Sequence, residues 1–278
     1  MTIDSVFLLT PVETFVPKKG AAAFALTLAS AMDAQLTSLV LELDVVTPRS
    51  WSIAEGAYAE EDRTGLDNAR AVGVADALMK AARDNGVPGE FITEHSHAHT
   101  VPRVVVDYAR MADISVTGSN DKGLLSELTL AEYILFQSGR PLIVVPGQHD
   151  QAFKCDHVVV AWDFSRNAAR ALGDALPFLR LAKTVSIVTF GDDKELESSL
   201  SGEDLVASLA DRGIEACYEH AERGARPIDA ALNDLARAQD ADLLVMGGYG
   251  HSRFRELVLG GATRGLLRDP AVPTLLAH

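Results

Sequence analysis

The chain has 278 residues, a length that allows either one large domain or two domains of ordinary size. Hydrophobic residues make up 47% of the chain and charged residues 23%, which is typical of a globular protein with a sizeable core. The net charge of −14 argues against non-specific binding to nucleic acids or to anionic membranes, because both surfaces would repel the chain.

Strands and helices alternate along the first half of the sequence. Short apolar runs predict strands at 6–9, 38–43, 89–94, 114–116 and 142–145. Longer periodic segments predict helices at 19–32, 64–85 and 101–111, with a further helix before the last strand. We expect the segment 47–61, which contains Trp51 and Tyr58, to be irregular and to cover an edge of the sheet rather than to form a lid.

The second half repeats this order. It predicts strands at 157–161, 185–190, 214–218 and 243–246 and helices at 167–181, 203–212 and 227–239. The run ADISVTG at 112–118 returns as ADLLVMG at 241–247, and RPLIVV at 140–145 returns more faintly as VPTLL at 272–276. The sequence therefore predicts a tandem duplication with a short joint at 146–154, built from parallel sheets covered on both faces.

No segment predicts export or membrane insertion. The opening residues lack a basic region, and their apolar run is too short for a signal peptide. No stretch approaches the roughly 20 apolar residues that a membrane span needs. Cys155 and Cys217 lie beside and within predicted strands, and we expect both to be reduced, buried thiols. These features predict a cytoplasmic protein with no membrane partner.

A glycine-rich stretch follows the last strand named above. Gly247, Gly248 and Gly250 end that strand, and a second pair, Gly260 and Gly261, opens a helical segment. Glycines let backbone N–H groups approach an anion, and a helix N-terminus adds unpaired donors, so the stretch is a candidate phosphate cradle. The alternative is that these glycines only turn a corner.

Two common nucleotide motifs are absent from this stretch. It has no Gly-Lys-Ser/Thr sequence for a P-loop. A dinucleotide fingerprint would need a third glycine where Arg253 stands.

The spacing Gly247-x-x-Gly250, nine residues, then Gly260 resembles the nucleotide signature of the ATP-binding class of universal stress proteins. The resemblance extends through the preceding strand and the closing residues 273–276. One position departs from the pattern, because Gly261 stands where that family has a hydroxyl residue. Thr263, one step into the helix, is the candidate to replace that hydroxyl.

The resemblance implies an α/β fold of two tandem five-stranded parallel-sheet domains, of the adenine nucleotide alpha hydrolase-like type. Each would have the strand order 3-2-1-4-5, and the two would pack as a pseudo-dimer. We place the degenerate first domain at 1–147 and the domain with the nucleotide motif at 154–278. Ligands of such sheets bind where the strand order reverses, beyond the carboxyl ends of strands 1 and 4.

Asp163 directly follows strand 1 of the second half. A carboxylate there can accept hydrogen bonds from a ribose hydroxyl or an adenine amino group. The alternative is that Asp163 or Ser165 caps the helix that begins near Arg166. The resemblance implies that Asp163 contacts the nucleoside and that the backbone of Phe190 meets adenine. It also adds residues of the pocket wall by position: Ala161, Met246 and Ala262.

The first half lacks these elements. Its first strand is followed by Thr10-Pro11-Val12-Glu13, without an aspartate, and only Gly118 matches the glycine pattern after its fourth strand. Asp121 would also bring negative charge close to a phosphate. We therefore expect one nucleotide per chain, in the second half, in the form of ATP, ADP or AMP with Mg²⁺.

Two further groups of side chains are candidates for binding. His95, His97 and His99 lie on one side of an extended segment and would suit zinc or another divalent metal, although a solvated polar loop is the commoner arrangement. The basic residues of 251–255 would either reach a terminal phosphate or form a solvated surface.

No residue pattern nominates a nucleophile or a general base, so we expect no catalytic residue and at most slow ATP hydrolysis. The leading hypothesis is a nucleotide-binding sensor or regulator of a stress response, whose chains can pair further as homodimers. The alternatives are a nucleotide-free interaction or scaffold protein, favoured by the missing hydroxyl at Gly261, and a metal-binding protein that uses the three histidines.

Overall fold

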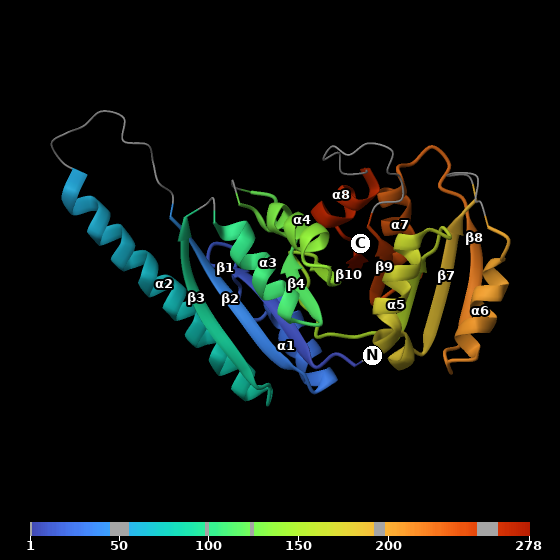
Figure 1. Cartoon of the computed structure of the whole chain (residues 1–278), viewed down its shortest axis with the longest axis horizontal. Helices are drawn as coiled ribbons and strands as arrows, with labels where there is room; N and C mark the ends of the chain where they lie inside the picture. Colours follow the sequence, from blue (N-terminus) through green and yellow to red (C-terminus); the bar gives the residue numbers. More distant parts are fainter. Residues whose placement is uncertain (1, 45–55, 98–99, 123–124, 192–197, 249–260) are drawn as a thin grey trace.

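The computed structural model describes residues 2–44, 56–97, 100–122, 125–191, 198–248 and 261–278. Strands and helices alternate within each half (Figure 1). The first half contains β1 (Ser5–Pro11), α1 (Gly20–Met32), β2 (Gln35–Asp44), α2 (Gly56–Asp84), β3 (Gly89–His97), α3 (Val101–Met111), β4 (Ile114–Gly118), α4 (Glu127–Gln137) and β5 (Leu142–Val145). The second half contains β6 (His157–Ala161), α5 (Arg166–Leu181), β7 (Thr184–Phe190), α6 (Gly202–Ala210), β8 (Ala216–Ala221), α7 (Ile228–Ala238), β9 (Leu243–Gly247), α8 (Gly261–Arg268) and β10 (Thr274–Ala277).

All the strands belong to one ten-stranded sheet with the order β3-β2-β1-β4-β5-β10-β9-β6-β7-β8. Neighbours within each half run parallel, whereas β5 and β10 pair antiparallel, with Ile143 opposite Leu275. Each half therefore has the expected strand order 3-2-1-4-5, but the five strands of one half continue into those of the other as a single sheet. Both joining strands are short and fully buried. By pairing with each other, they satisfy main-chain groups that each half would otherwise leave unpaired at an open sheet edge.

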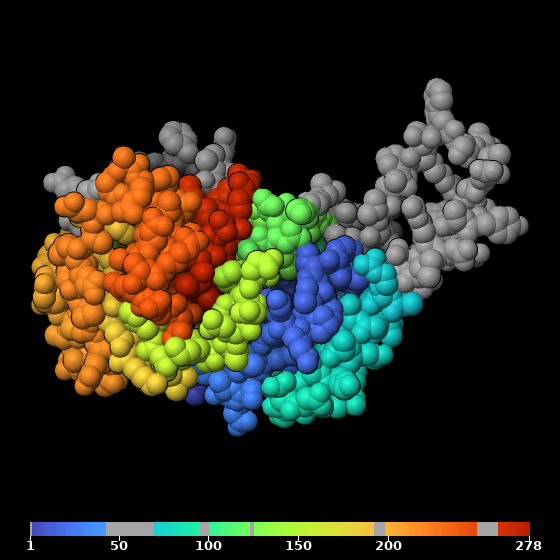
Figure 2. Space-filling view, turned by 180° about the vertical axis from the view of Figure 1, so that it is seen from behind, coloured from blue at the N-terminus to red at the C-terminus, as the bar shows by residue number. Residues whose placement is uncertain are grey.

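Helices cover both faces of the sheet. One apolar cluster lies under α1, α2, α5 and α6, and the other lies under α3, α4, α7 and α8. Because both faces are covered, β4 and β5 are buried at every position, which explains the continuous apolar sequence of β5. Seen from behind, the first and second halves occupy opposite sides of the molecule (Figure 2).

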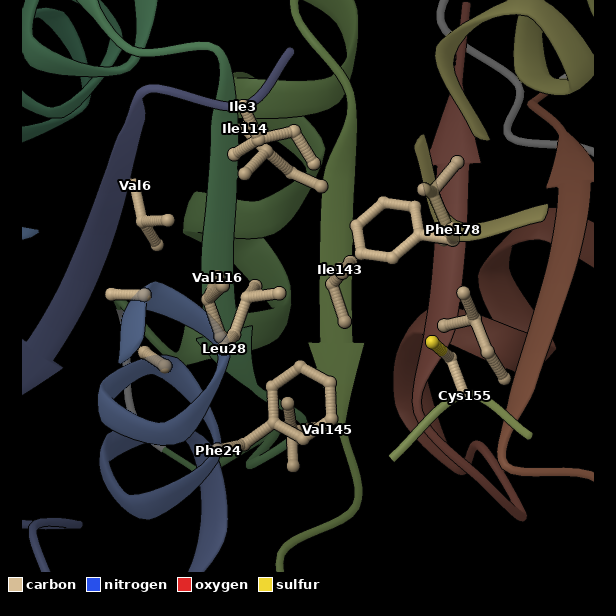
Figure 3. Close-up of a cluster of buried hydrophobic side chains, with 14 of the residues drawn as sticks. Ile3, Val6, Phe24, Leu28, Ile114, Val116, Ile143, Val145, Cys155 and Phe178 are labelled. Atoms are coloured by element: carbon tan, nitrogen blue, oxygen red, sulfur yellow. The ribbon is translucent and has the colours of Figure 1, made fainter. Parts of the chain in front are cut away.

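The first cluster runs without interruption across the junction between the halves. Ile143 and Val145 of β5 lie between Phe24 of α1 and Phe178 of α5 (Figure 3). Phe153 joins the two helices, with ring centroids 5.5 Å from Phe24 and 5.9 Å from Phe178. The joint predicted at 146–154 thus contributes to the core.

The same contact occurs inside each half, at the amino ends of the strands. Oδ2 of Asp113 accepts a hydrogen bond from the Ser5 N–H at 3.0 Å, and Oδ2 of Asp242 accepts one from the His157 N–H at 3.0 Å. These aspartates belong to the repeated runs at 112–118 and 241–247. In each half, the repeat therefore fixes the start of the fourth strand against the start of the first.

Several predicted boundaries were wrong by a few residues. Residues 56–61 belong to α2 and are not irregular, in keeping with their alanine and glutamate content, whereas 45–55 lie outside the described residues. The strand β3 continues to His97 because β2 is long enough to pair with it as far as Asp44. The strand predicted at 214–218 is shifted to 216–221, where β7 provides partners up to Phe190.

One prediction about the cysteines was also wrong. Cys155 is buried as expected, but Cys217 is exposed, because β8 is an edge strand that pairs only with β7 in the sheet. Both are free thiols. In addition, no helix in the described part of the chain combines the length and the apolar character of a membrane span.

Candidate nucleotide site

The candidate site lies where the strand order reverses in the second half. The strand β6 pairs with β7 on one side and with β9 on the other, with Val160 opposite Val245. The chain leaves β6 through α5 toward β7 and leaves β9 toward β10, in opposite directions across the sheet. The connections after β6 and β9 therefore lead to opposite sides of this point, and open α/β sheets bind ligands beyond the carboxyl ends of the strands at such a point.

Asp163 lies in a tight turn between β6 and α5. Its Oδ1 accepts a hydrogen bond from the Ser165 N–H at 3.0 Å, and Phe164 between them has φ 59°. Ser165 is the N-cap of α5, and its hydroxyl accepts a hydrogen bond from the Ala168 N–H at 3.1 Å. The capping role thus falls to Ser165, while the half-buried Asp163 carboxylate orders the turn.

The ends of β6 and β7 are joined by hydrogen bonds. The N–H of Trp162 donates to the Val188 carbonyl at 2.8 Å, and the Thr189 hydroxyl donates to the Trp162 carbonyl at 2.7 Å. Thr189 is buried, and Phe190 follows it at the end of β7. The end of β7, which is expected to meet adenine, is therefore fixed to the end of β6, which leads into the Asp163 turn.

Gly247 is required by the packing of α5 against β9. A Cβ at residue 247 would lie 2.5 Å from the Ala168 nitrogen and 2.7 Å from the Asn167 carbonyl oxygen, closer than real Cβ atoms come. The helix N-terminus thus rests directly on the strand end. The absence of a side chain at Gly247 has a packing cause, whatever the loop beyond it binds.

Gly248 is held by hydrogen bonds on both sides. Its N–H donates to the Ala277 carbonyl at 2.7 Å, and its carbonyl accepts a hydrogen bond from Nδ2 of the buried Asn167. The chain therefore leaves β9 in a fixed direction. The next residues of the motif, Gly250 and Gly260, lie outside the described residues, as do His251, Arg253 and Arg255.

The helix α8 begins at Gly261. This residue is exposed, and a Cβ built on it meets no atom of the described residues within 4 Å. Ala262 is half-buried, whereas Thr263 is only 2% exposed. The hydroxyl proposed to replace the one missing at Gly261 thus belongs to a buried side chain, and an added side chain at Gly261 would find open space.

The remaining wall residues lie on one side of the sheet. Ala161, Phe190 and Met246 all contact the apolar cluster under α7 and α8. Sequence reasoning did not identify Asn167 and Thr189, because their roles depend on a carbonyl 81 residues away for Asn167 and 27 residues away for Thr189. Their positions beside the Asp163 turn and the Phe190 strand end were the only local signals.

In the first half, Glu13 occupies the position equivalent to Asp163. The Val12 N–H donates to the Leu41 carbonyl at 3.1 Å, as the Trp162 N–H does to Val188. The next residue, Glu13, is exposed. Asp121 does not remain a free negative charge, because its carboxylate lies 3.3 Å from Nε of Arg268 in α8.

The candidate metal site lies largely outside the described residues. His95 and His97 belong to β3, but the structure does not describe their side chains or His99. The described part of the chain contains no group of three or more histidine, cysteine, aspartate or glutamate side chains placed to hold a metal ion.

Comparison with solved structures supports the fold over nearly the whole chain. A universal stress protein from Archaeoglobus fulgidus DSM 4304 superposes with a TM-score of 0.70 at 18% identity, covering 98% of this chain and 95% of the other. A putative universal stress protein from Pseudomonas aeruginosa UCBPP-PA14 superposes with a TM-score of 0.56 at 13% identity, covering 99% and 93%. At these identities the likeness is one of fold.

Sequence comparison points to the same family. The chain is 28% identical over 150 residues to the universal stress protein Slr1230 of Synechocystis, a match that covers 52% of this chain and 49% of the relative. The match thus spans about half the length of that relative. The model of the universal stress protein family matches residues 154–278. The second half of this chain is therefore a universal stress protein domain.

Proposed function

We propose that the universal stress protein domain at 154–278 binds ATP or a related adenine nucleotide, with Mg²⁺ on the phosphates. The observation that carries this proposal is the arrangement at the switch point. There the Asp163 turn after β6 and the Gly247-Gly248 exit from β9 end two neighbouring parallel strands. Asp163 would accept hydrogen bonds from the nucleoside, and the glycine loop leading to Gly261 would hold the phosphates.

The architecture supports a regulatory role for the bound nucleotide. We propose that 1–147 and 154–278 are two domains of a tandem repeat, packed as a pseudo-dimer through β5 and β10, and that the first supports the second. The helix after the glycine loop, α8, contacts the first half through Arg268 and Asp121. A nucleotide at its N-terminus would therefore stabilise the contact between the halves, which suits a cytoplasmic stress sensor or regulator better than a catalyst.

The main alternative, a nucleotide-free interaction protein, is favoured by the missing hydroxyl at Gly261. One experiment separates it from the proposal. We would denature the untreated, purified protein and identify the released small molecules by mass spectrometry. ATP, ADP or AMP at about one per chain supports the proposal. If none is released, the protein would be titrated with ATP and Mg²⁺ at millimolar concentration, and the absence of binding there would favour the interaction protein.

A further inference from the structure

The first half fills its own switch-point loop with a side chain. Glu127, the first residue of α4, turns its carboxylate back onto the end of β4. Oε2 accepts a hydrogen bond from the Asn120 N–H at 3.0 Å, and Oε1 accepts one from the Thr14 hydroxyl at 3.1 Å. A Cβ on Gly118 would lie 2.6 Å from each of these oxygens. The carboxylate therefore occupies the space that Gly118 leaves open.

In the described part of the chain, this carboxylate has hydrogen-bond donors around it and no cation paired with it. Glu127 is 7% exposed, and within the described part of the chain it makes no salt bridge. Burial raises the pKa of Glu127, while hydrogen bonds from the Asn120 N–H, the Thr14 hydroxyl and the Gly118 N–H act in the opposite direction. Backbone N–H groups and a hydroxyl converging on an anion at a helix start are the features of a loop that binds oxyanions.

In the second half, the described residues on either side of the corresponding loop carry no such carboxylate. That loop also leaves the fourth strand of its half at a glycine, but α8 begins with Gly261 and Ala262 and has no acidic residue in its first turn. The two halves thus differ in one respect that decides occupancy. The first carries a carboxylate at the helix start, and the second carries none there.

We propose that the segment from Gly118 to Asn120 and the start of α4 form an anion-binding cradle whose permanent occupant is the Glu127 carboxylate, standing in for the phosphate of a ligand. This explains how the first half keeps the switch-point geometry without a nucleotide. It goes beyond the proposed function, because it assigns a second anion site to a half for which no ligand is expected.

The filled cradle also fixes a surface that the other half uses. The Asn120 carbonyl accepts a hydrogen bond from the Leu128 N–H at 3.1 Å, and the next residue, Asp121, pairs with Arg268 of α8. Asn120 is thus held on both sides, because its N–H donates to the Glu127 carboxylate and its carbonyl accepts from the Leu128 N–H. In the first half, the internal carboxylate maintains permanently the loop conformation that a bound phosphate would maintain in the second.

The test is chemical rescue in the full chain. In Glu127→Ala we expect a lower Tm than in wild type and a saturable rise of roughly 2–4 °C on adding inorganic phosphate, measured against sodium chloride of equal ionic strength. Wild type sets the baseline for phosphate bound in the second half. Glu132→Ala, which changes another glutamate of α4, should show no rise beyond that baseline. An identical response of Glu127→Ala to phosphate and to chloride would overturn the proposal.

A second variant keeps the proposal testable if Glu127→Ala does not fold. Glu127→Gln fills the same space, but it replaces one carboxylate oxygen, which accepts a hydrogen bond, with an amide NH₂. That NH₂ group would face another donor. We expect hydrogen exchange of the 118–122 amides to accelerate by about tenfold relative to wild type. Unchanged exchange would show that the negative charge does not hold the loop. Neither result depends on ATP binding in the second half, which the variants of Asp163 test separately.

Discussion

Gly247 lies against the backbone of Asn167 so closely that a Cβ on the glycine would stand 2.7 Å from the Asn167 carbonyl oxygen. The first glycine of the motif therefore sets how near α5 can approach β9. The side chain of the same Asn167 donates a hydrogen bond to the Gly248 carbonyl. The turn that carries Asp163 and the Gly247-Gly248 end of β9 are thus fixed to each other through one asparagine.

This packing predicts unequal effects of adding a methyl group to two glycines. Gly247→Ala should lower the free energy of unfolding by about 1–3 kcal/mol, because the methyl group has no room against α5. Gly261→Ala should change it by less than about 0.5 kcal/mol, since its Cβ meets nothing within 4 Å. Denaturant unfolding of both variants measures the difference, and equal destabilisation would contradict the packing role of Gly247.

Replacing Asp163 should weaken nucleotide binding. Asp163→Ala removes a charged hydrogen-bond acceptor, and we expect Kd for ATP to rise by about 10- to 100-fold. Asp163→Asn, which keeps an oxygen for the Ser165 N–H, should preserve the turn and separate turn stability from ligand contact. Glu13→Ala is the matched control at the equivalent position of the first half and should leave Kd unchanged. Isothermal titration calorimetry distinguishes these outcomes.

Restoring a hydroxyl at Gly261 should tighten binding. Gly261→Ser adds a donor at the start of α8, where the structure has room for it, and one added hydrogen bond to phosphate is worth about 1–2 kcal/mol. This corresponds to about a 5- to 30-fold lower Kd. The gain should appear for ATP and disappear for adenosine, which has no phosphate. Equal gains for both ligands would place the serine away from the phosphates.

The buried carboxylate of Glu127 predicts a pH dependence of stability. Its pKa in the folded chain is raised above its ordinary value of 4.5, chiefly by burial, so the folded state holds this proton to a higher pH than the unfolded state does. Its contribution to the free energy of unfolding is therefore largest below pH 4.5 and falls as pH rises through the folded pKa, by at most about 1.4 kcal/mol per pH unit.

Glu127→Gln removes the titrating carboxyl group and provides the comparison. The difference in free energy of unfolding between wild type and Glu127→Gln should change as pH rises from 4.5 through the folded pKa, with wild type losing stability relative to the variant. Other titrating groups are common to both proteins and cancel. A constant difference over this range would show that Glu127 does not titrate as its burial predicts.

The two cysteines should differ in reactivity. Burial, with the charges of Asp242 and Asp156, raises the pKa of Cys155 to about 11, whereas Cys217 is exposed on the edge strand β8. At about pH 8 a thiol-specific reagent should label one cysteine per native chain rapidly and the second only after unfolding. Peptide mapping identifies the fast site, and rapid labelling of Cys155 in the native protein would contradict its burial.

The features of the fold that come from continuous apolar runs were predictable from sequence. The strand β6 and the helix α3 have the predicted bounds, because a buried strand and an amphipathic helix each have a strong periodic signal. The family resemblance places the last strands of the two halves near their interface, but the direct pairing of β5 with β10 does not follow from the apolar runs themselves. Nothing in LIVV or TLLA specifies which partner a short apolar strand will take across the chain.

The candidate site shows the same division. The turn at Asp163 and the room at Gly261 follow from residue types that sequence reasoning identified. The roles of Asn167 and Glu127 did not, because a buried polar side chain acquires its function from a main-chain partner that the fold brings to it. From the sequence, Glu127 is explained by its place in the first turn of α4, where an acidic residue interacts favourably with the helix dipole. That place does not indicate that its carboxylate packs into the preceding loop.

The most direct test of the account is a calorimetric titration of the full chain with ATP and Mg²⁺, run beside Asp163→Ala and Glu13→Ala. The account predicts one site per chain, weakened by Asp163→Ala and unchanged by Glu13→Ala. Absence of binding at millimolar ATP, or equal affinity in all three proteins, would contradict a nucleotide site at the ends of β6 and β9.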